Sequence, residues 1–381
     1  MIDPEIFINY FMSKEIDTFY GVPDSLLKPV CNYLNNLPSH KHQISTNEAM
    51  SISCAIGNHL ANGKISCVYM QNSGLGNAIN PLVSLASKEV YSIPMILLIG
   101  WRGEILNDNN QIKDEPQHTM QGRITCNQLE LLNIPYIILA NNSQYWEDDI
   151  EKIHSLALKE RKPVAILCRK NTFKPYKLIK SNIYLERNEP LTRREDIIRK
   201  IVIARVNIPI FSTTGMTSRE LYEIRKEVKD PTADFYTIGG MGCASTIALG
   251  FKRGSGCKQV ICIDGDGAAL MHLGSLFKIS EEKGFIHIII NNNAHDSVGG
   301  QPTDANRIDF ISLGKSLGYD LIYSIKTMDE FEKALTTSIL QKNCSCLIEL
   351  KVSIGSRENL GRPKETPIML KEMFINKWSN K

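Results

Sequence analysis

The chain has 381 residues, a length at which two domains are the default organisation. A net charge of +3 without a dense basic tract argues against nucleic acid and membrane surfaces as partners, and no apolar run is long enough to span a bilayer. Ten scattered cysteines and an N-terminus without the features of a signal peptide indicate a reducing compartment. We therefore expect a soluble cytoplasmic protein.

The first half of the sequence alternates between short apolar runs and segments with helical spacing. Strands are predicted over 18–21, 43–46, 66–70, 94–99, 136–140 and 164–168, and helices over 6–16, from 26, over 49–62 and over 79–87. This alternation predicts a parallel, doubly wound sheet. Residues 104–121 break the pattern and are predicted to form a polar loop, of a length that is often functional.

The same scheme returns after a basic, proline-containing stretch that we interpret as a linker. Strands are predicted over 208–212, 235–237, 260–263, 286–290 and 346–351, and helices over 194–205, 219–226, 244–250, 268–280, 311–317 and 367–378. The expected organisation is a first domain over 1–172, a linker over 173–193 and a second domain over 194–381. The fold class is therefore α/β, with two doubly wound parallel-sheet domains.

Polar residues close two of the apolar runs in the second half. Asp264-Gly265-Asp266-Gly267 follows one run, and Asn291-Asn292-Asn293-Ala294 follows the next. The carboxyl ends of parallel strands meet at one edge of a sheet, so these oxygens should lie close together and suit Mg²⁺ or Ca²⁺. Gly265 and Gly267 would let the backbone approach a phosphate. The sequence therefore predicts a metal–diphosphate site.

This spacing of Gly-Asp-Gly and Asn-Asn resembles the signature of thiamine diphosphate enzymes. The resemblance implies thiamine diphosphate as cofactor, with Mg²⁺ or another divalent cation such as Ca²⁺ or Mn²⁺ bound by Asp266, Asn292 and the carbonyl of Ala294. It makes residues 1–172 the pyrimidine-binding domain and 194–381 the diphosphate-binding domain. The implied cofactor-binding residues are Thr214, Gly215, Met216, Thr217, Gly239, Gly240, Met241, Gly265, Asp266, Gly267, Ala268, Asn292, Asp296 and Ser297.

Two further residues have implied roles in the family. A carboxylic acid hydrogen-bonded to the cofactor's aminopyrimidine ring assists deprotonation of its thiazolium ring, and the resemblance assigns this catalytic role to Glu48. Met241 would be the large apolar side chain that supports the bent cofactor. The plain alternatives are a first-turn glutamate that favours the helix dipole and a core methionine beside a glycine turn.

Other segments resemble the phosphonopyruvate decarboxylase family, and the match runs almost end to end. They are 21–25, 113–118, 217–221, 294–303 and 360–363, and one departure is Asn293, where glycine is expected. The resemblance implies a carboxy-lyase that converts 3-phosphonopyruvate to phosphonoacetaldehyde and CO₂ in phosphonate biosynthesis. Ser25 and His118 become catalytic candidates, although a helix-cap serine and a solvent-facing histidine are the plain alternatives.

Several alternatives stay open. Sulfopyruvate decarboxylation is the nearest, and an acetolactate-synthase-like carboligase would keep the same cofactor residues, whereas a non-enzymatic protein would have lost them. The phosphonate needs a cation, and Arg102, Lys113 and Arg123 are equal candidates. Because Glu48 and the metal site fall in different domains, the resemblance implies at least a homodimer, or a higher homo-oligomer, with active sites shared between subunits.

Overall fold

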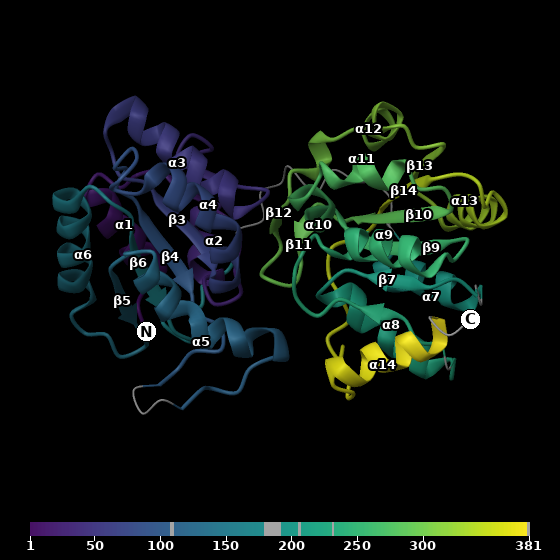
Figure 1. Ribbon diagram of the computed structural model, residues 1–381. Helices are drawn as coiled ribbons and strands as arrows, with labels where there is room; N and C mark the ends of the chain where they lie inside the picture. The colour runs from purple at the N-terminus through teal and green to yellow at the C-terminus, as the bar shows by residue number, and fades with distance from the viewer. Residues whose placement is uncertain (107–109, 179–191, 205–206, 231, 379–381) are drawn as a thin grey trace. The chain divides into compact units, whose positions relative to one another are not determined.

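The chain folds into two compact units, Met1–Ser181 and Asn182–Lys381, in a computed structural model that describes residues 1–106, 110–178, 192–204, 207–230 and 232–378 (Figure 1). Both units are α/β folds with a parallel sheet, as the alternating pattern predicted. The expected boundaries at 172 and 194 stay predictions. Most of the expected linker, residues 179–191, lies outside the described residues.

The first unit is built on a six-stranded sheet in which all neighbouring strands are parallel, in the order β2-β1-β3-β4-β6-β5. Its strands are β1 (Phe19–Gly21), β2 (His42–Ile44), β3 (Cys67–Gln71), β4 (Ile96–Gly100), β5 (Tyr136–Leu139) and β6 (Val164–Cys168). Its helices are α1 (Pro4–Ser13), α2 (Lys28–Leu34), α3 (Glu48–Asn62), η1 (Asn72–Gly74), α4 (Leu75–Pro81), η2 (Leu82–Ala86), α5 (Pro116–Leu131) and α6 (Trp146–Glu160).

Helices cover both faces of this sheet. Helices α1, α2 and α6 pack on one face, and α3, α4, η2 and α5 pack on the other. Side chains alternate along each strand. Tyr69 and Leu98 therefore pack against α1, α2 and α6, whereas Met70 and Ile99 pack against the helices on the opposite face. Burial on both faces explains why β3, β4 and β6 read as continuous apolar runs.

The second unit repeats the plan with the parallel order β13-β14-β10-β9-β7-β8 and a small antiparallel hairpin, β11-β12. Its strands are β7 (Ile210–Ser212), β8 (Phe235–Tyr236), β9 (Val260–Gly265), β10 (Phe285–Asn291), β11 (Ala294–His295), β12 (Gln301–Pro302), β13 (Leu321–Ile325) and β14 (Cys346–Lys351). Its helices are α7 (Arg194–Ile203), α8 (Met216–Glu227), α9 (Ala244–Ser255), α10 (Asp266–Met271), α11 (Ser275–Ser280), η4 (Ala305–Arg307), α12 (Phe310–Leu317), α13 (Met328–Leu340) and α14 (Pro367–Trp378).

The two sheets have the same strand order. With β7, β8, β9, β10, β13 and β14 numbered one to six, the second sheet reads 2-1-3-4-6-5 from β8, which is the order of the first sheet. In both sheets, the second strand lies on one side of the first strand, and the third strand lies on its other side. Ligands of such sheets bind at this switch point, beyond the carboxyl ends of the strands. The predicted site motifs follow those strand ends.

Two local expectations were wrong, and some elements were not predicted. Residues 104–121 are not all loop, because α5 begins at Pro116, a residue suited to the first turn of a helix. The helix expected over 268–280 is divided into α10 and α11, with Gly274 at the start of α11. Helix α6, strand β13 and helix α13 were not predicted, although Thr327 and Glu330 form a capping box at the start of α13.

All ten cysteines are free thiols, and none forms a disulfide. Among the described residues, no helix has both the length and the apolar character needed to cross a bilayer.

Candidate active site

A pocket lies beyond the carboxyl ends of β7, β9 and β10 in the second unit. It has about 510 Å³ of empty volume, which includes open solvent. The expected cofactor and metal residues that line it are Thr214, Met216, Thr217, Met241, Gly265, Asp266, Gly267, Ala268, Asn292, Ala294, Asp296 and Ser297. Gly215 lies beside Ser297, and Gly239 and Gly240 form the turn before Met241. One pocket therefore gathers most of the residues expected to bind the cofactor, while Gly215, Gly239 and Gly240 do not line it.

Asp266 is the buried carboxylate of this pocket. It begins α10, is 2% exposed and accepts a hydrogen bond from the Thr303 hydroxyl. Burial raises the pKa of Asp266 to about 6, and the Thr303 hydrogen bond only partly offsets this. Among the described residues, no cationic side chain forms an ion pair with Asp266. A buried carboxylate in this state would be stabilised by a divalent cation.

The turn after β10 places Asn292 and Ala294 in the same pocket. The Asn292 amide oxygen accepts a hydrogen bond from the Ala294 N–H at 3.0 Å. Asn293, the departure from the expected glycine, has a φ of 56°, in the left-handed region that glycine and asparagine tolerate best. Its N–H donates to the Asn291 side chain at 3.1 Å. Asparagine thus adopts a backbone conformation that glycine would also allow.

The walls of the pocket suit an anionic group. A Cβ at Gly267 would lie 2.9 Å from His295 Cε1, so only glycine fits without displacing that ring. The Thr214 hydroxyl donates to the Ile238 carbonyl at 2.6 Å, which fixes the loop after β7 against the turn that leads to Met241. The α8 helix begins at Met216 in the same wall, and a helix start presents backbone N–H groups to phosphates.

Sequence reasoning missed Arg194, which lines this pocket, and its ion-pair partner Glu220, which does not line it. Arg194 is 5% exposed and pairs with Glu220 at 2.7 Å and with Asp296 at 2.9 Å. These partners lie 26 and 102 positions away in the sequence, and no local motif joins them. Their proximity is a consequence of the fold alone.

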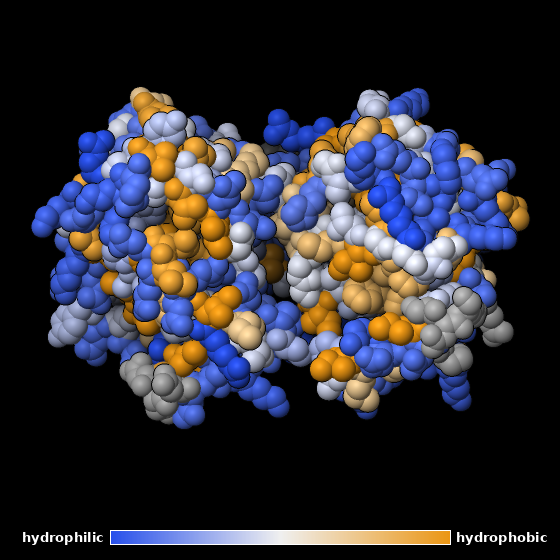
Figure 2. All heavy atoms as spheres, in the orientation of Figure 1, coloured by the Kyte–Doolittle hydropathy of each residue, from blue (hydrophilic) through white to orange (hydrophobic). Residues whose placement is uncertain are grey.

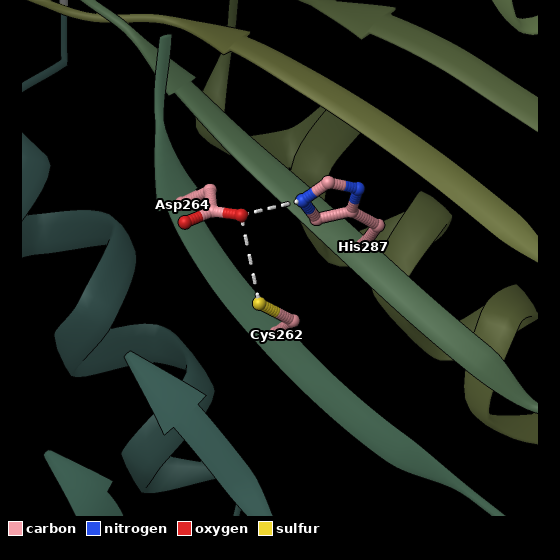
Figure 3. Close-up of side chains that lie close together, drawn as sticks. All are labelled: Cys262, Asp264 and His287. Atoms are coloured by element: carbon pink, nitrogen blue, oxygen red, sulfur yellow. Dashed lines mark hydrogen bonds and ion pairs between the residues drawn. The ribbon is translucent and has the colours of Figure 1, made fainter. Parts of the chain in front are cut away.

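A buried polar cluster lies in the sheet just before the site (Figure 3). Cys262 and Asp264 on β9 and His287 on β10 bring their ligand atoms within 4.8 Å of one another, and all three side chains are buried. The His287 Nε2 atom lies 3.0 Å from the Asp264 carboxylate, and the Cys262 sulfur lies 3.8 Å from the same oxygen. Because the ring and the carboxylate bond each other directly, we interpret the cluster as a crosslink between β9 and β10, two residues before Asp266.

Glu48 lies in the first unit, as the first residue of α3. Its carboxylate is 5% exposed and accepts a hydrogen bond from the Asn77 amide at 2.7 Å. A Cβ at Gly74 would lie 2.4 Å from Glu48 Oε1, so the glycine provides the space that the carboxylate occupies. Asn47 caps the helix through the Met50 N–H. The carboxylate is thus held by Asn77 and packed against Gly74, at the start of a capped helix.

Ser25 and His118 belong to a second group in the first unit. Arg102, after β4, donates to the Ser25 hydroxyl at 2.9 Å and binds both carboxylate oxygens of Asp114, at 2.6 and 2.8 Å. Burial alone would raise the pKa of Asp114, but the Arg102 hydrogen bonds hold it well below its usual value, and the charge of His118 acts in the same direction. His118 is 6% exposed, so it is not the solvent-facing loop histidine of the plain alternative. It lies in the first turn of α5.

The η1 turn joins these two groups at one edge of the sheet. Asn72 accepts from the Arg102 N–H at 3.2 Å and donates to the Arg102 carbonyl at 2.9 Å, while Gly74 in the same turn touches Glu48. Asp24, which sequence reasoning missed, is fully buried and accepts from the Leu26 and Leu27 N–H groups. It shapes the turn that presents Ser25.

The first unit holds a buried glutamate at a helix start, and the second holds a pocket with a carboxylate and an amide. Residues 5–131 match the N-terminal TPP binding domain of thiamine pyrophosphate enzymes, and residues 213–350 match the C-terminal TPP binding domain. Both units therefore have the thiamine diphosphate-binding fold.

Among thiamine diphosphate enzymes, the proteins most similar in sequence to this chain that we describe are decarboxylases. The chain is 30% identical over 373 residues to a phosphonopyruvate decarboxylase of Streptomyces viridochromogenes, which covers 94% of this chain and 90% of the relative. It is also 36% identical over 190 residues to the sulfopyruvate decarboxylase subunit beta of Methanocaldococcus jannaschii, over 48% of this chain and 95% of that subunit. The subunit alpha of Methanococcus maripaludis is 35% identical over 41% of this chain and 87% of that subunit. The chain therefore belongs to the family of thiamine diphosphate-dependent decarboxylases that includes phosphonopyruvate decarboxylase.

Proposed function

We propose that this protein decarboxylates 3-phosphonopyruvate to phosphonoacetaldehyde and CO₂, as a step in phosphonate biosynthesis. The similarity to a phosphonopyruvate decarboxylase over nearly the whole length of both chains carries the proposal. The two sulfopyruvate decarboxylase subunits each match less than half of this chain, at slightly higher identity, and a sulfopyruvate decarboxylase of Methanosarcina acetivorans matches 69% of this chain at 29% identity. Sulfopyruvate, which has a sulfonate in place of the phosphonate, is therefore the second candidate substrate.

The second unit would hold the diphosphate through a divalent cation, for which we propose Mg²⁺. Asp266, the Asn292 amide oxygen and the Ala294 carbonyl would be its protein ligands, and hard oxygen ligands of this kind suit Mg²⁺, Ca²⁺ and Mn²⁺. The observation that supports this fit is the buried Asp266 carboxylate without a cationic partner among the described residues. Met241 in the same pocket would support the cofactor from its apolar side.

Glu48 would act on the aminopyrimidine side of the cofactor. When bound, thiamine diphosphate supplies the electron sink that makes loss of CO₂ possible. The chain's part is to hold a carboxyl group at one place: Asn77 orients it, and Gly74 leaves room for it. A carboxyl group positioned in this way can donate or accept a proton at a fixed place.

Ser25 and His118 would handle protons at the substrate. Both lie in the group organised by Arg102 and Asp114, at the same sheet edge as Glu48. Histidine can change protonation near neutral pH, which suits a group that protonates a product carbon or binds a carboxylate.

Arg102 is the best supported of the three candidate phosphonate contacts. Its guanidinium is held in place by Asp114 and Ser25, whereas Arg123 is hydrogen-bonded to Gln111 on an exposed surface. Lys113 is exposed. A guanidinium held in this way loses less conformational entropy when it binds an anion, which favours binding.

A homodimer or higher homo-oligomer would complete the active site, with Glu48 from one subunit acting with the metal pocket of another. Figure 2 shows apolar side chains gathered on the visible face of the first unit. The exposed apolar residues of η2 and α5 are Val83, Leu85, Met120, Ile124 and Leu131. Exposed apolar side chains that form a patch are typical of a subunit contact, and these five are candidates for one.

The proposal is tested by measuring CO₂ release from 3-phosphonopyruvate, from sulfopyruvate and from pyruvate under the same conditions. We expect kcat/KM to be highest for phosphonopyruvate and activity to require both thiamine diphosphate and a divalent cation. Replacing Arg102 by Met should lower kcat/KM for phosphonopyruvate far more than for pyruvate, which lacks the phosphonate. Faster turnover of sulfopyruvate would show that sulfopyruvate is the substrate, and the assignment of the cofactor would still hold.

A further inference from the structure

Asp296 receives hydrogen bonds from three separate parts of the second unit. Its carboxylate oxygen Oδ2 accepts from the Asn292 amide at 2.7 Å and from the Arg194 guanidinium at 2.9 Å. The Gly355 N–H, beyond the end of β14, lies 3.2 Å from the same oxygen. The carboxylate therefore joins the start of α7, the turn after β10 and the segment after β14.

Arg194 is itself fixed in orientation. Its Nε and Nη2 atoms donate to the two carboxylate oxygens of Glu220 at 2.7 and 3.0 Å, and Nη2 also lies 3.4 Å from the Gly355 carbonyl. The side chains of Arg194 and Glu220 are only 6% and 1% exposed. A two-point pair buried to this degree leaves the guanidinium little freedom, so its third nitrogen holds Asp296 in one place.

The carboxylate determines which way the Asn292 amide faces. A carboxylate can only accept hydrogen bonds, so the amide must turn its NH₂ group toward Asp296. The amide oxygen then faces the other way, where it accepts from the Ala294 N–H at 3.0 Å. With the amide reversed, its oxygen would meet the Asp296 oxygen, and the proposed metal ligand would be lost.

We infer that Asp296, held by Arg194 and Glu220, is a positioning residue that fixes the Asn292 amide with its oxygen toward the cation. The inference rests on the proposed metal site. The sequence predicts that Asp296 contacts the cofactor directly. In this inference the Asp296 carboxylate instead acts through Asn292.

The test measures the Mn²⁺ dissociation constant by electron paramagnetic resonance, with the full chain and saturating thiamine diphosphate. Replacing Asp296 by Ala should weaken Mn²⁺ binding about 10- to 100-fold, the usual effect of losing a group that orients a metal ligand. Asp296→Asn keeps an oxygen that can accept from Asn292, so its affinity should stay within about threefold of wild type. In an Asn292→Ala background, the Asp296→Ala change should add almost nothing.

Asp309→Ala is the matched control. Asp309 caps α12 in the same unit through the Ile311 and Ser312 N–H groups and has no hydrogen bond to Asn292. Its loss should lower the thermal midpoint of the protein without cofactor but leave Mn²⁺ affinity unchanged, which separates stability from metal binding.

Three results would overturn the inference: Asp296→Ala binding Mn²⁺ as tightly as wild type, Asp296→Asn as weak as Asp296→Ala, or losses that multiply in the double variant. If wild type binds no Mn²⁺ in the presence of thiamine diphosphate, the proposed metal site itself is wrong, and the inference falls with it.

Discussion

The Glu48 carboxylate lies against Gly74, so a glycine-to-alanine substitution there would add one carbon atom beside it. Gly74 and Gly76 are two residues apart, but a Cβ at Gly74 would lie 2.4 Å from Glu48 Oε1, whereas a Cβ at Gly76 would meet nothing within 4 Å. We predict that Gly74→Ala lowers kcat on the order of 100-fold, because the carboxylate must move by about 1 Å. Steady-state kinetics of Gly74→Ala and Gly76→Ala checks this, and equal rates for the two variants would contradict it.

At Asn293 the backbone conformation favours glycine. The residue has a φ of 56°, is 9% exposed, and its side-chain oxygen has no hydrogen-bond partner among the described residues. We predict that Asn293→Gly keeps or raises the free energy of unfolding, while Asn293→Ala lowers it by about 1 kcal/mol. Urea unfolding of both variants measures this, and a more stable alanine variant would show that the left-handed backbone is not the constraint.

Residues in compact motifs could be identified from the sequence, and residues joined only by the fold could not. Asp266 and Asn292 each follow an apolar strand within a recognisable run, so their place at the sheet edge follows from local order. Arg194 and Glu220 stand in ordinary helical segments. Their pairing depends on how α7 and α8 pack, which no short pattern encodes.

At the scale of elements, buried strands were the most predictable because both of their faces are apolar. Helix α5 was missed because its buried face is made of His118, Gly122, Thr125 and Leu129, which give little apolar periodicity. Strand β13 lies at the edge of its sheet and is only partly buried, so its signal is weaker than that of β10. The buried face of α5 is thus poor in apolar side chains, and the candidate site residue His118 lies on it.

A buried histidine joins strands β2 and β3 of the first unit. His42 on β2 is 8% exposed, its ring lies 2.8 Å from the Tyr69 hydroxyl on β3, and burial lowers its pKa to about 4. The unfolded chain therefore takes up this proton first as the pH falls. The contribution to stability is complete above about pH 6.5 and is lost toward pH 4, by on the order of 3 kcal/mol in total.

We predict that His42→Gln unfolds with a smaller loss of stability between pH 7 and pH 4.5 than wild type does. His40→Gln is the matched control, because His40 is exposed and lies two residues away. Urea unfolding at both pH values gives the difference. The same pH dependence in wild type and in His42→Gln would rule out His42 as its source.

At the scale of the whole molecule, the two units share one strand order but carry different chemical groups. If active sites are shared between subunits, Glu48→Gln and Asp266→Asn should each be inactive alone and complement each other when subunits exchange. Random dimers would recover about a quarter of wild-type activity, because half of them are mixed and each mixed dimer carries one intact site. Cofactor-dependent CO₂ release from the mixture measures this, and its failure to recover any activity would contradict the shared site.

The central claim is tested most directly by following 3-phosphonopyruvate with ³¹P nuclear magnetic resonance in the presence of the purified protein. With thiamine diphosphate and Mg²⁺, we predict conversion to phosphonoacetaldehyde with an equal amount of CO₂, and no conversion when either is withheld or when Asp266 is replaced by Asn. An unchanged phosphonopyruvate signal, under conditions in which the same preparation consumes another 2-keto acid, would contradict the proposed substrate.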